Sequence, residues 1–134
     1  MENIKKFFKN DKFAEYVGIE LLEVSEGRAK AKMQIKENHL NSVGIVHGGA
    51  VVALADLVFS VASNSHGTVA VSINVSISYL KAVKTGILFA EAKEVSRNPK
   101  LATYTIHVTD EYDEIVAIFQ GMVYRKKEKI NDIL

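Results

Sequence analysis

The sequence predicts an α+β fold in which an antiparallel sheet curls around one long central helix. Residues 50–65 form a nearly unbroken apolar run that suits a buried helix, and the segments on either side of it have strand-like patterns. The strands after this helix are separated by short turns, which is typical of antiparallel pairing. Because the helix is apolar on too many sides to rest on a flat sheet, we expect the sheet to wrap around it.

The segments before the central helix are predicted to form a short helix and a β-hairpin. Apolar residues at helical spacing between lysines predict an amphipathic helix over residues 4–16, which Gly18 should end. Residues 19–24 and 28–35 have strand patterns, and the second alternates polar and apolar residues almost strictly. A turn at residues 26–27 joins them into a hairpin.

The segments after the central helix are predicted to form four consecutive strands. These cover residues 68–80, 87–95, 101–109 and 115–124, and the charged tail over 125–134 is expected to fray. Alternation along the first of them divides its side chains between an apolar face (Val71, Ile73, Val75, Ile77, Tyr79) and a polar face (Ser72, Asn74, Ser76, Ser78). We expect Tyr79 and Phe59 to lie in the core rather than in a pocket.

The composition limits the possible classes of partner. The chain has 134 residues, which suits a single domain over 1–134, and its net charge of +1 gives no reason to expect nucleic acid or an anionic membrane as a partner. The longest apolar run contains a charge and is too short to cross a bilayer. The N-terminus is too charged for a signal peptide, and cysteine is absent, so we expect a cytoplasmic protein.

A motif at the start of the central helix holds the candidate functional residues. Asn41 and Gly44 precede the triplet His47-Gly48-Gly49, and the following apolar run contains one carboxylate, Asp56. A carboxylate in such a helix is costly to bury unless it is paired, hydrogen-bonded or placed in a cleft. We therefore expect Asp56 to lie at the centre of the function.

This motif, the helix and the strands that follow resemble the hotdog-fold acyl-CoA thioesterases, and among them the phenylacetate-pathway type. The resemblance covers residues 17–124 and includes the Leu54-Ala55-Asp56 context and the Lys84-Thr85-Gly86 turn. It implies an acyl-CoA substrate and no cofactor, since coenzyme A is part of the substrate. It also implies a homodimer formed by sheet edges, with dimers often pairing into tetramers.

The same resemblance implies roles for individual residues. Asp56 matches the catalytic carboxylate, which acts as a nucleophile or as a general base for water. Gly48 matches the residue whose backbone N–H polarises the thioester carbonyl. Asn41 matches a side chain that holds the carbonyl or the attacking water, and Ser72 matches a hydroxyl that positions water. In this family the Asp and the Gly of one site come from different protomers.

Physical chemistry agrees with these roles. The N-terminus of a helix has unpaired N–H groups and a partial positive charge, so it can hold a developing oxyanion. Gly48 and Gly49 allow a substrate to approach that backbone closely. Asp56 lies roughly 12 Å further along the helix, so one chain's Gly48 and Asp56 cannot contact the same carbonyl. A site shared across a two-fold axis resolves this, and desolvation should raise the pKa of Asp56.

Structural readings compete with each of these roles. Asp56 could cap a loop or pair with a lysine, and Asn41 could simply cap a turn. His47 could be a general base or a metal ligand, but we expect it to fix the turn by a local hydrogen bond. Ser72 could belong to a solvated face. The four histidines lack metal-ligand spacing, so no metal site is expected.

The sequence leaves the phosphate-binding residues, the type of reaction and the acyl group open. Arg97 and Lys100, together with Lys81, could bind the phosphates of coenzyme A, although surface basic residues are usually only solubilising. A hotdog-fold dehydratase or hydratase and a non-catalytic acyl-CoA-binding protein are the competing functions. Aromatic, short-chain and medium-chain acyl groups all remain possible.

Overall fold

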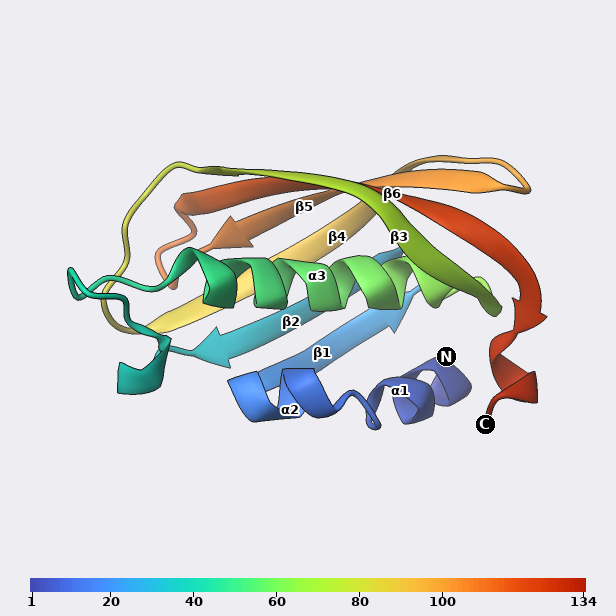
Figure 1. The fold of residues 1–134 in the computed structure, drawn as a ribbon, viewed down its shortest axis with the longest axis horizontal. Helices are drawn as coiled ribbons and strands as arrows, with labels where there is room; N and C mark the ends of the chain where they lie inside the picture. Colours follow the sequence, from blue (N-terminus) through green and yellow to red (C-terminus); the bar gives the residue numbers. More distant parts are fainter.

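The computed structural model describes residues 1–134 and has the predicted architecture, a single antiparallel sheet curved around one long helix (Figure 1). The sheet has six strands in the order β1-β2-β4-β5-β6-β3. The elements in chain order are α1 (Glu2–Phe8), α2 (Lys12–Val17), β1 (Ile19–Ser25), β2 (Arg28–Gln34), η1 (Glu37–His39), α3 (Gly48–Asn64), β3 (Thr68–Tyr79), β4 (Ile87–Arg97), β5 (Leu101–Thr109), β6 (Ile115–Lys129) and η2 (Ile130–Asp132). None of the helices is both long and apolar enough to span a membrane.

Helix α3 packs into the concave face of the sheet and supplies much of the core. Phe59 is fully buried, as predicted, and its ring lies 5.6 Å from that of Phe119 and 5.9 Å from that of Tyr104. The ring also occupies the space beside Gly121 on β6, where an added Cβ would lie 2.5 Å from it. A side chain at Gly121 would therefore push α3 away from the sheet.

The prediction that protein encloses α3 on nearly every side is wrong for one face. Gly49 and Asp56 are exposed, and Val52, Ala53 and Ser60 are only partly buried. Their spacing of three, four and seven residues places them on one stripe of the helix, which we call the open stripe. Helices α1 and α2 flank α3 on one side and β3 flanks it on the other (Figure 1). The sheet buries the opposite stripe.

Strand β3 lies at an edge of the sheet, which corrects the expectation that consecutive strands are neighbours. It pairs with β6, and residues 80–86 cross the end of the sheet to begin β4 (Figure 1). The other long side of this strand has no partner within the chain. The remaining turns, including the hairpin between β1 and β2, join neighbouring strands as predicted.

A β-bulge between Ser72 and Asn74 divides β3 and corrects its predicted faces. Ser72 lies opposite the buried residue Val123, and Val75 lies opposite the buried residue Gly121. The step between these two pairs is three residues on β3 but only two residues on β6. Directly opposed residues share a face, so Ser72 joins Val75 on the face toward α3. Val71, which was expected to share that face, lies on the outer one.

Both ends of the chain differ from the prediction. The N-terminal helix is two helices, because the Asp11 side chain accepts a hydrogen bond from the Ala14 N–H and starts α2. Gly18 ends α2 in the left-handed conformation, as predicted. At the C-terminus β6 continues to Lys129, and the N–H of the buried Ile130 donates to the Gly67 carbonyl, so the tail is held here rather than frayed.

Candidate functional site

The first turn of α3 has one backbone N–H without an acceptor. The Nδ1 atom of His47 accepts from the Gly49 N–H at 2.8 Å, and the His47 carbonyl accepts from Ala50 and Val51. This is the local hydrogen bond expected of His47. The Gly48 N–H is the one that remains, and it lies at the positive end of the helix dipole. This turn is therefore a preformed donor for an oxygen that carries negative charge.

The loop before α3 is closed by Asn41. Its side-chain oxygen accepts from the Val43 N–H at 3.1 Å and from the Ile45 N–H at 3.2 Å, while Gly44 takes a positive φ of 82°. The expected turn cap is thus present. The amide nitrogen of Asn41 makes no hydrogen bond within the chain and remains available as a donor.

Asn41 and Gly48 line a hollow of about 410 Å³ at the N-terminal end of α3, which we call the helix-mouth hollow. Its wall is mostly aliphatic and includes Tyr79, a residue that is 53% exposed. The expectation that Tyr79 is a core residue is therefore wrong. It is at the end of an edge strand, where no further strand covers it. The other lining residues are Ile45, Val46, Val51, Leu80, Lys81, Ala82, Val83 and Val116.

Lys81 also lines this hollow, but its charge is already balanced. Its ammonium group donates to Asp110 at 2.6 Å and to Glu114. These hydrogen bonds raise the pKa of Lys81 above its usual value. An ammonium group held between two carboxylates is poorly placed to bind phosphate, so this candidate for coenzyme A binding loses support.

Asp56 lies on the open stripe, about two turns from Gly48. The helix was predicted to be buried, but within a single chain this carboxylate is exposed. Its pKa is nevertheless raised, as predicted, first by desolvation from the surrounding side chains and then by the negative charge of Asp11. Asp56 makes no hydrogen bond or ion pair within the chain. It therefore neither caps a loop nor pairs with a lysine, the two structural roles considered for it.

Asp11 is a nearby carboxylate that the sequence reasoning missed. It caps α2, and its charge contributes to the raised pKa of Asp56. The usable signal was an aspartate directly before a helical segment, which predicts a cap. No pattern in the sequence relates that cap to a residue 45 positions away.

The remaining candidates lie in different places. Gly49 belongs to the open stripe, and Ser72 lies on the α3-facing side of β3. Arg97 and Lys100 are near the turn between β4 and β5, which lies at the C-terminal end of α3 (Figure 1). One chain therefore places these two basic residues at the opposite end of the helix from Gly48.

Arg97 belongs to a polar cluster that fixes this end of α3. Its guanidinium donates to Nδ1 of His66, and Glu94 accepts from the Tyr104 hydroxyl at 2.8 Å and pairs with Nε2 of His66 at 2.9 Å. Burial alone would raise the pKa of Glu94. The hydrogen bonds from Tyr104 and His66 and the nearby charges outweigh it and lower that pKa. Lys100 is exposed and makes no ion pair.

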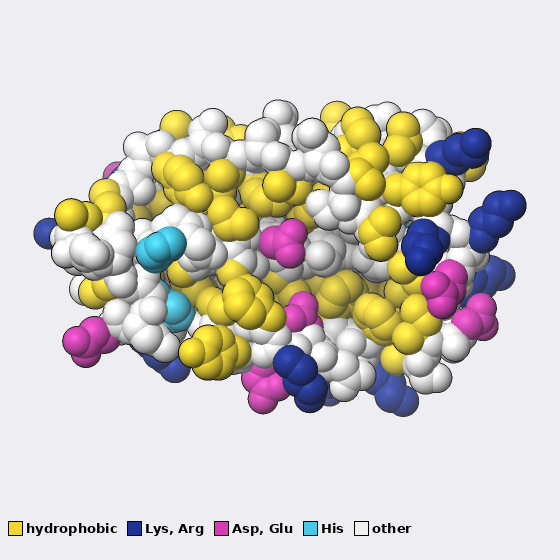
Figure 2. Space-filling model, viewed as in Figure 1, with side chains coloured by type: hydrophobic (Ala, Val, Ile, Leu, Met, Phe, Trp, Pro, Cys, Tyr) yellow, Lys and Arg dark blue, Asp and Glu magenta, His cyan; other side chains and the backbone are white.

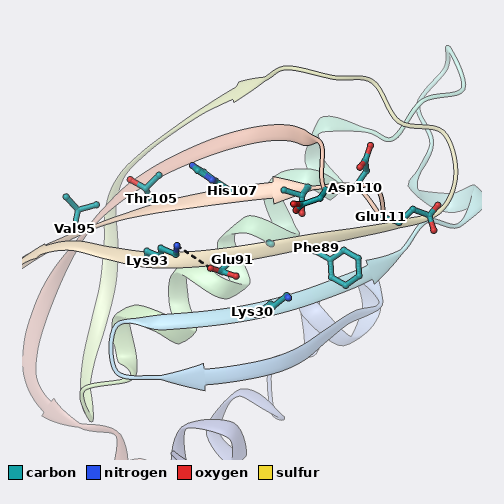
Figure 3. A pocket seen from close by; sticks show the side chains of 12 residues that line it. Lys30, Phe89, Glu91, Lys93, Val95, Thr105, His107, Asp110 and Glu111 are labelled. Carbon is teal, nitrogen blue, oxygen red and sulfur yellow. Dashed lines mark ion pairs between the residues drawn. The ribbon is translucent and has the colours of Figure 1, made fainter.

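The largest hollow, of about 600 Å³, lies on the outer face of the sheet and contains none of the motif residues. Figure 3 shows Lys30, Phe89, Glu91 and His107 on this face, turned away from α3. Lys93 and Glu91 form an ion pair at 3.6 Å. No group of three or more His, Cys, Asp or Glu side chains is arranged to hold a metal ion.

Comparison with known proteins identifies a matching family and several relatives of this chain. The family model of the thioesterase superfamily matches residues 43–117. The acyl-coenzyme A thioesterase PaaI of Escherichia coli is 30% identical over 92% of this chain and 89% of its own. A protein of Archaeoglobus fulgidus, provisionally named an esterase, is 45% identical over 96% of this chain and 84% of its own.

Solved structures agree with these sequence matches. The structure of the E. coli PaaI protein from the phenylacetic acid degradation operon has a TM-score of 0.92 at 29% identity, covering 96% of this chain and 94% of that one. A mutant of the phenylacetic acid degradation protein PaaI from Thermus thermophilus has a TM-score of 0.83 at 35% identity, covering 87% and 100%. The sheet around α3 is therefore the hotdog fold that the sequence predicted.

The contacts of His47 predict a difference between two substitutions. H47A removes the acceptor of the Gly49 N–H and should lower the free energy of unfolding by about 0.5–2 kcal/mol. H47N supplies a side-chain oxygen that can replace it and should recover most of that loss. Urea denaturation of the two variants measures the difference. Equal losses in both would show that the cap does not stabilise α3.

Proposed function

Because this chain belongs to the thioesterase superfamily and is a thioester hydrolase, we propose that it hydrolyses an acyl-CoA thioester to the free acid and coenzyme A, in a site shared by two copies of the chain. Asp56 of one copy faces the Gly48 N–H of the other. The observation that carries this proposal is that α3 holds a carboxylate without a partner and an N–H without an acceptor, too far apart to act together within one chain.

The thioester carbonyl oxygen accepts a hydrogen bond from the Gly48 N–H. Its carbon then becomes more electrophilic, and the charge that develops on oxygen lies at the positive end of α3. The free amide nitrogen of Asn41, in the same hollow, holds the carbonyl or the attacking water. His47 acts by fixing the turn, and Gly49 keeps the approach to it open. Asp56 either removes a proton from the water that attacks the carbonyl carbon, or attacks that carbon itself to form an anhydride that water then hydrolyses. Ser72 positions the water.

An edge-to-edge dimer through β3 would complete the site. The unpartnered edge is twelve residues long and carries Val71, Ile73 and Val75, which are 42–53% exposed. A long apolar edge of this kind favours pairing with another strand.

The face that shows α3 also suits a second copy. On this face hydrophobic side chains lie on both sides of the middle, while lysines and arginines gather toward one end and the lower rim (Figure 2). A second copy placed there would cover the open stripe and desolvate Asp56 further. Pairing of two such dimers into a tetramer remains a prediction.

The acyl group is proposed from the relatives and from the size of the helix-mouth hollow. One relative is named an acyl-coenzyme A thioesterase, and the matching structure comes from a phenylacetic acid degradation operon. An aliphatic hollow of about 410 Å³ suits an aryl-acetyl or short-chain acyl group. Lys100 is the better candidate for the coenzyme A phosphates, since Arg97 is already bound to His66. No separate cofactor or metal is proposed.

Replacing Asp56 by asparagine tests the function directly. D56N should lower kcat for release of free thiol from phenylacetyl-CoA and butyryl-CoA by about 10²–10⁴-fold, because the nucleophile or base is lost. Binding of the acyl-CoA, measured by calorimetry, should persist. D132N changes an exposed aspartate in η2 and should behave as the wild type. Unchanged thiol release in D56N would contradict the assignment, and hydration of crotonyl-CoA without thiol release would indicate a hydratase.

The raised pKa of Asp56 predicts the acid side of the pH profile. Asp56 must be ionised to act, so kcat/KM should fall as the pH drops through a midpoint above the ordinary aspartate value of 3.8. D11N removes a charge that raises this pKa, whereas its asparagine oxygen can still cap α2. The midpoint should therefore move to lower pH in D11N. An unchanged or higher midpoint would show that the two carboxylates do not interact.

Mixing two inactive variants tests whether the site is shared. D56N lacks the carboxylate, and G48V places a side chain where the Tyr79 hydroxyl already lies 2.8 Å from the Cβ position. A mixed dimer has one site with both changes and one with neither. An equal mixture of co-refolded chains should therefore recover about a quarter of the wild-type activity. Mixed dimers that form, as shown by co-purification of two tags, but stay inactive would contradict a shared site.

A further inference from the structure

The hydroxyl group of Tyr79 lies directly beside the first residue of α3. It is 3.3 Å from the Gly48 carbonyl oxygen, to which it donates. Its ring and hydroxyl occupy the space that a side chain at Gly48 would fill, with the hydroxyl 2.8 Å and the adjoining ring carbon 3.1 Å from the Cβ position. Strand β3 thus carries a phenol group to the turn that holds the free N–H.

Core packing does not account for this position. Tyr79 is 53% exposed, and it contributes to the wall of the helix-mouth hollow. The other fixed polar side chain that reaches the hollow with a free donor is Asn41, because the ammonium of Lys81 is bound to two carboxylates. A Phe at this position would provide the same apolar contact. The apolar contact therefore does not explain why this residue carries a hydroxyl group.

The geometry allows Tyr79 and the Gly48 N–H to share one oxygen atom. Standard covalent geometry puts a Cβ roughly 2.5 Å from the nitrogen of its own residue. The hydroxyl oxygen, 2.8 Å from that Cβ position, thus lies within about 5.3 Å of the Gly48 nitrogen. Two donors with this separation can both reach a single oxygen, since donors in an oxyanion hole lie about 2.7–3.1 Å from it.

We infer that Tyr79 is a catalytic residue, a second hydrogen-bond donor to the carbonyl oxygen of the thioester beside the Gly48 N–H. This inference rests on the proposed thioester hydrolysis. When the nucleophile attacks, the π electrons of the carbonyl move onto oxygen, and Tyr79 donates a hydrogen bond to it while keeping its proton. The electron pair then returns to carbon, the C–S bond breaks and the thiolate leaves.

The existing hydrogen bond of Tyr79 is weak enough to be exchanged. An O–H···O bond is usually about 2.7–2.8 Å long, and the bond to the Gly48 carbonyl is 3.3 Å. That carbonyl also lies within the helical hydrogen-bond pattern of α3, so it retains an N–H donor when the phenol turns away. A bond to a charged oxygen is roughly twice as strong as a neutral one, so the developing oxyanion attracts the hydroxyl.

The Y79F variant removes the hydroxyl and keeps the ring, so it tests the hydroxyl alone. In the chain of residues 1–134, kcat for thiol release should fall about 10- to 100-fold while KM changes less than about twofold, because the bond strengthens only in the transition state. Y112F removes an exposed hydroxyl in the turn after β5 and should match the wild type. A rise in KM with kcat unchanged would overturn the inference and make Tyr79 a wall of the acyl site.

The affinity for two analogues that are not hydrolysed provides a second measurement. It should be the same in Y79F and the wild type if Tyr79 has only a structural role. One is the α,α-difluoro dethia ketone of the acyl-CoA, whose carbonyl carbon readily becomes tetrahedral and whose oxygen mimics the developing oxyanion, and the other is the S-alkyl thioether, which lacks that oxygen. Y79F should lose affinity for the ketone by several-fold and keep its affinity for the thioether. Equal changes for both analogues would overturn the inference. If the wild type hydrolyses no acyl-CoA, the proposed function fails, whereas an active wild type with an equally active Y79F refutes only the role of Tyr79.

Discussion

The packing of α3 into the concave face of the sheet is the contact on which the rest of the structure depends. Phe59 occupies the space that Gly121 leaves open on β6 and meets the rings of Tyr104 and Phe119. This contact fixes the rotation of the helix about its axis. Rotation in turn decides that Asp56 lies on the open stripe, where no part of the same chain pairs with it. A helix rotated by half a turn would bury that carboxylate against the sheet without a partner, at a large cost.

The two ends of α3 are held in different ways, and the difference matters for chemistry. At the C-terminal end, Glu94 accepts from the Tyr104 hydroxyl and pairs with His66, which lies two residues beyond the helix. At the N-terminal end, His47 satisfies the Gly49 N–H but nothing satisfies that of Gly48. The helix is thus anchored at one end and keeps a free donor at the other. Such a donor needs no rearrangement when charge develops on a bound oxygen, which is what makes preorganised sites effective.

Local patterns in the sequence predict most of the fold, and non-local contacts account for what they miss. The central helix, the hairpin at residues 26–27 and the strands were predicted because periodicity and turn residues act over a few positions. The pairing of β3 with β6 was missed, because which strand lies next to which depends on the whole sheet. The bulge after Ser72 has no local signal, yet it reverses the faces of half the strand.

The candidate site shows the same division between local patterns and non-local contacts. The spacing of Gly48 and Asp56 on one helix is local, so their separation follows from the rise of a helix alone. The approach of Tyr79 to Gly48 joins residues 31 positions apart, and the charge of Asp11 reaches Asp56 from another helix. These contacts exist only once the sheet has formed, so a pattern in the sequence does not reveal them.

The raised pKa of Asp56 connects this arrangement to stability. A carboxyl group whose pKa is higher in the folded chain than in the unfolded one favours folding below its unfolded pKa, and that contribution is lost as the pH rises through the folded value. At neutral pH the ionised Asp56 therefore opposes folding rather than supporting it. Covering the open stripe with a second copy would add to this opposition through further desolvation, and the apolar edge of β3 is the surface whose burial can offset it. In the proposed dimer, assembly and the chemistry of Asp56 would both follow from leaving one face of α3 open.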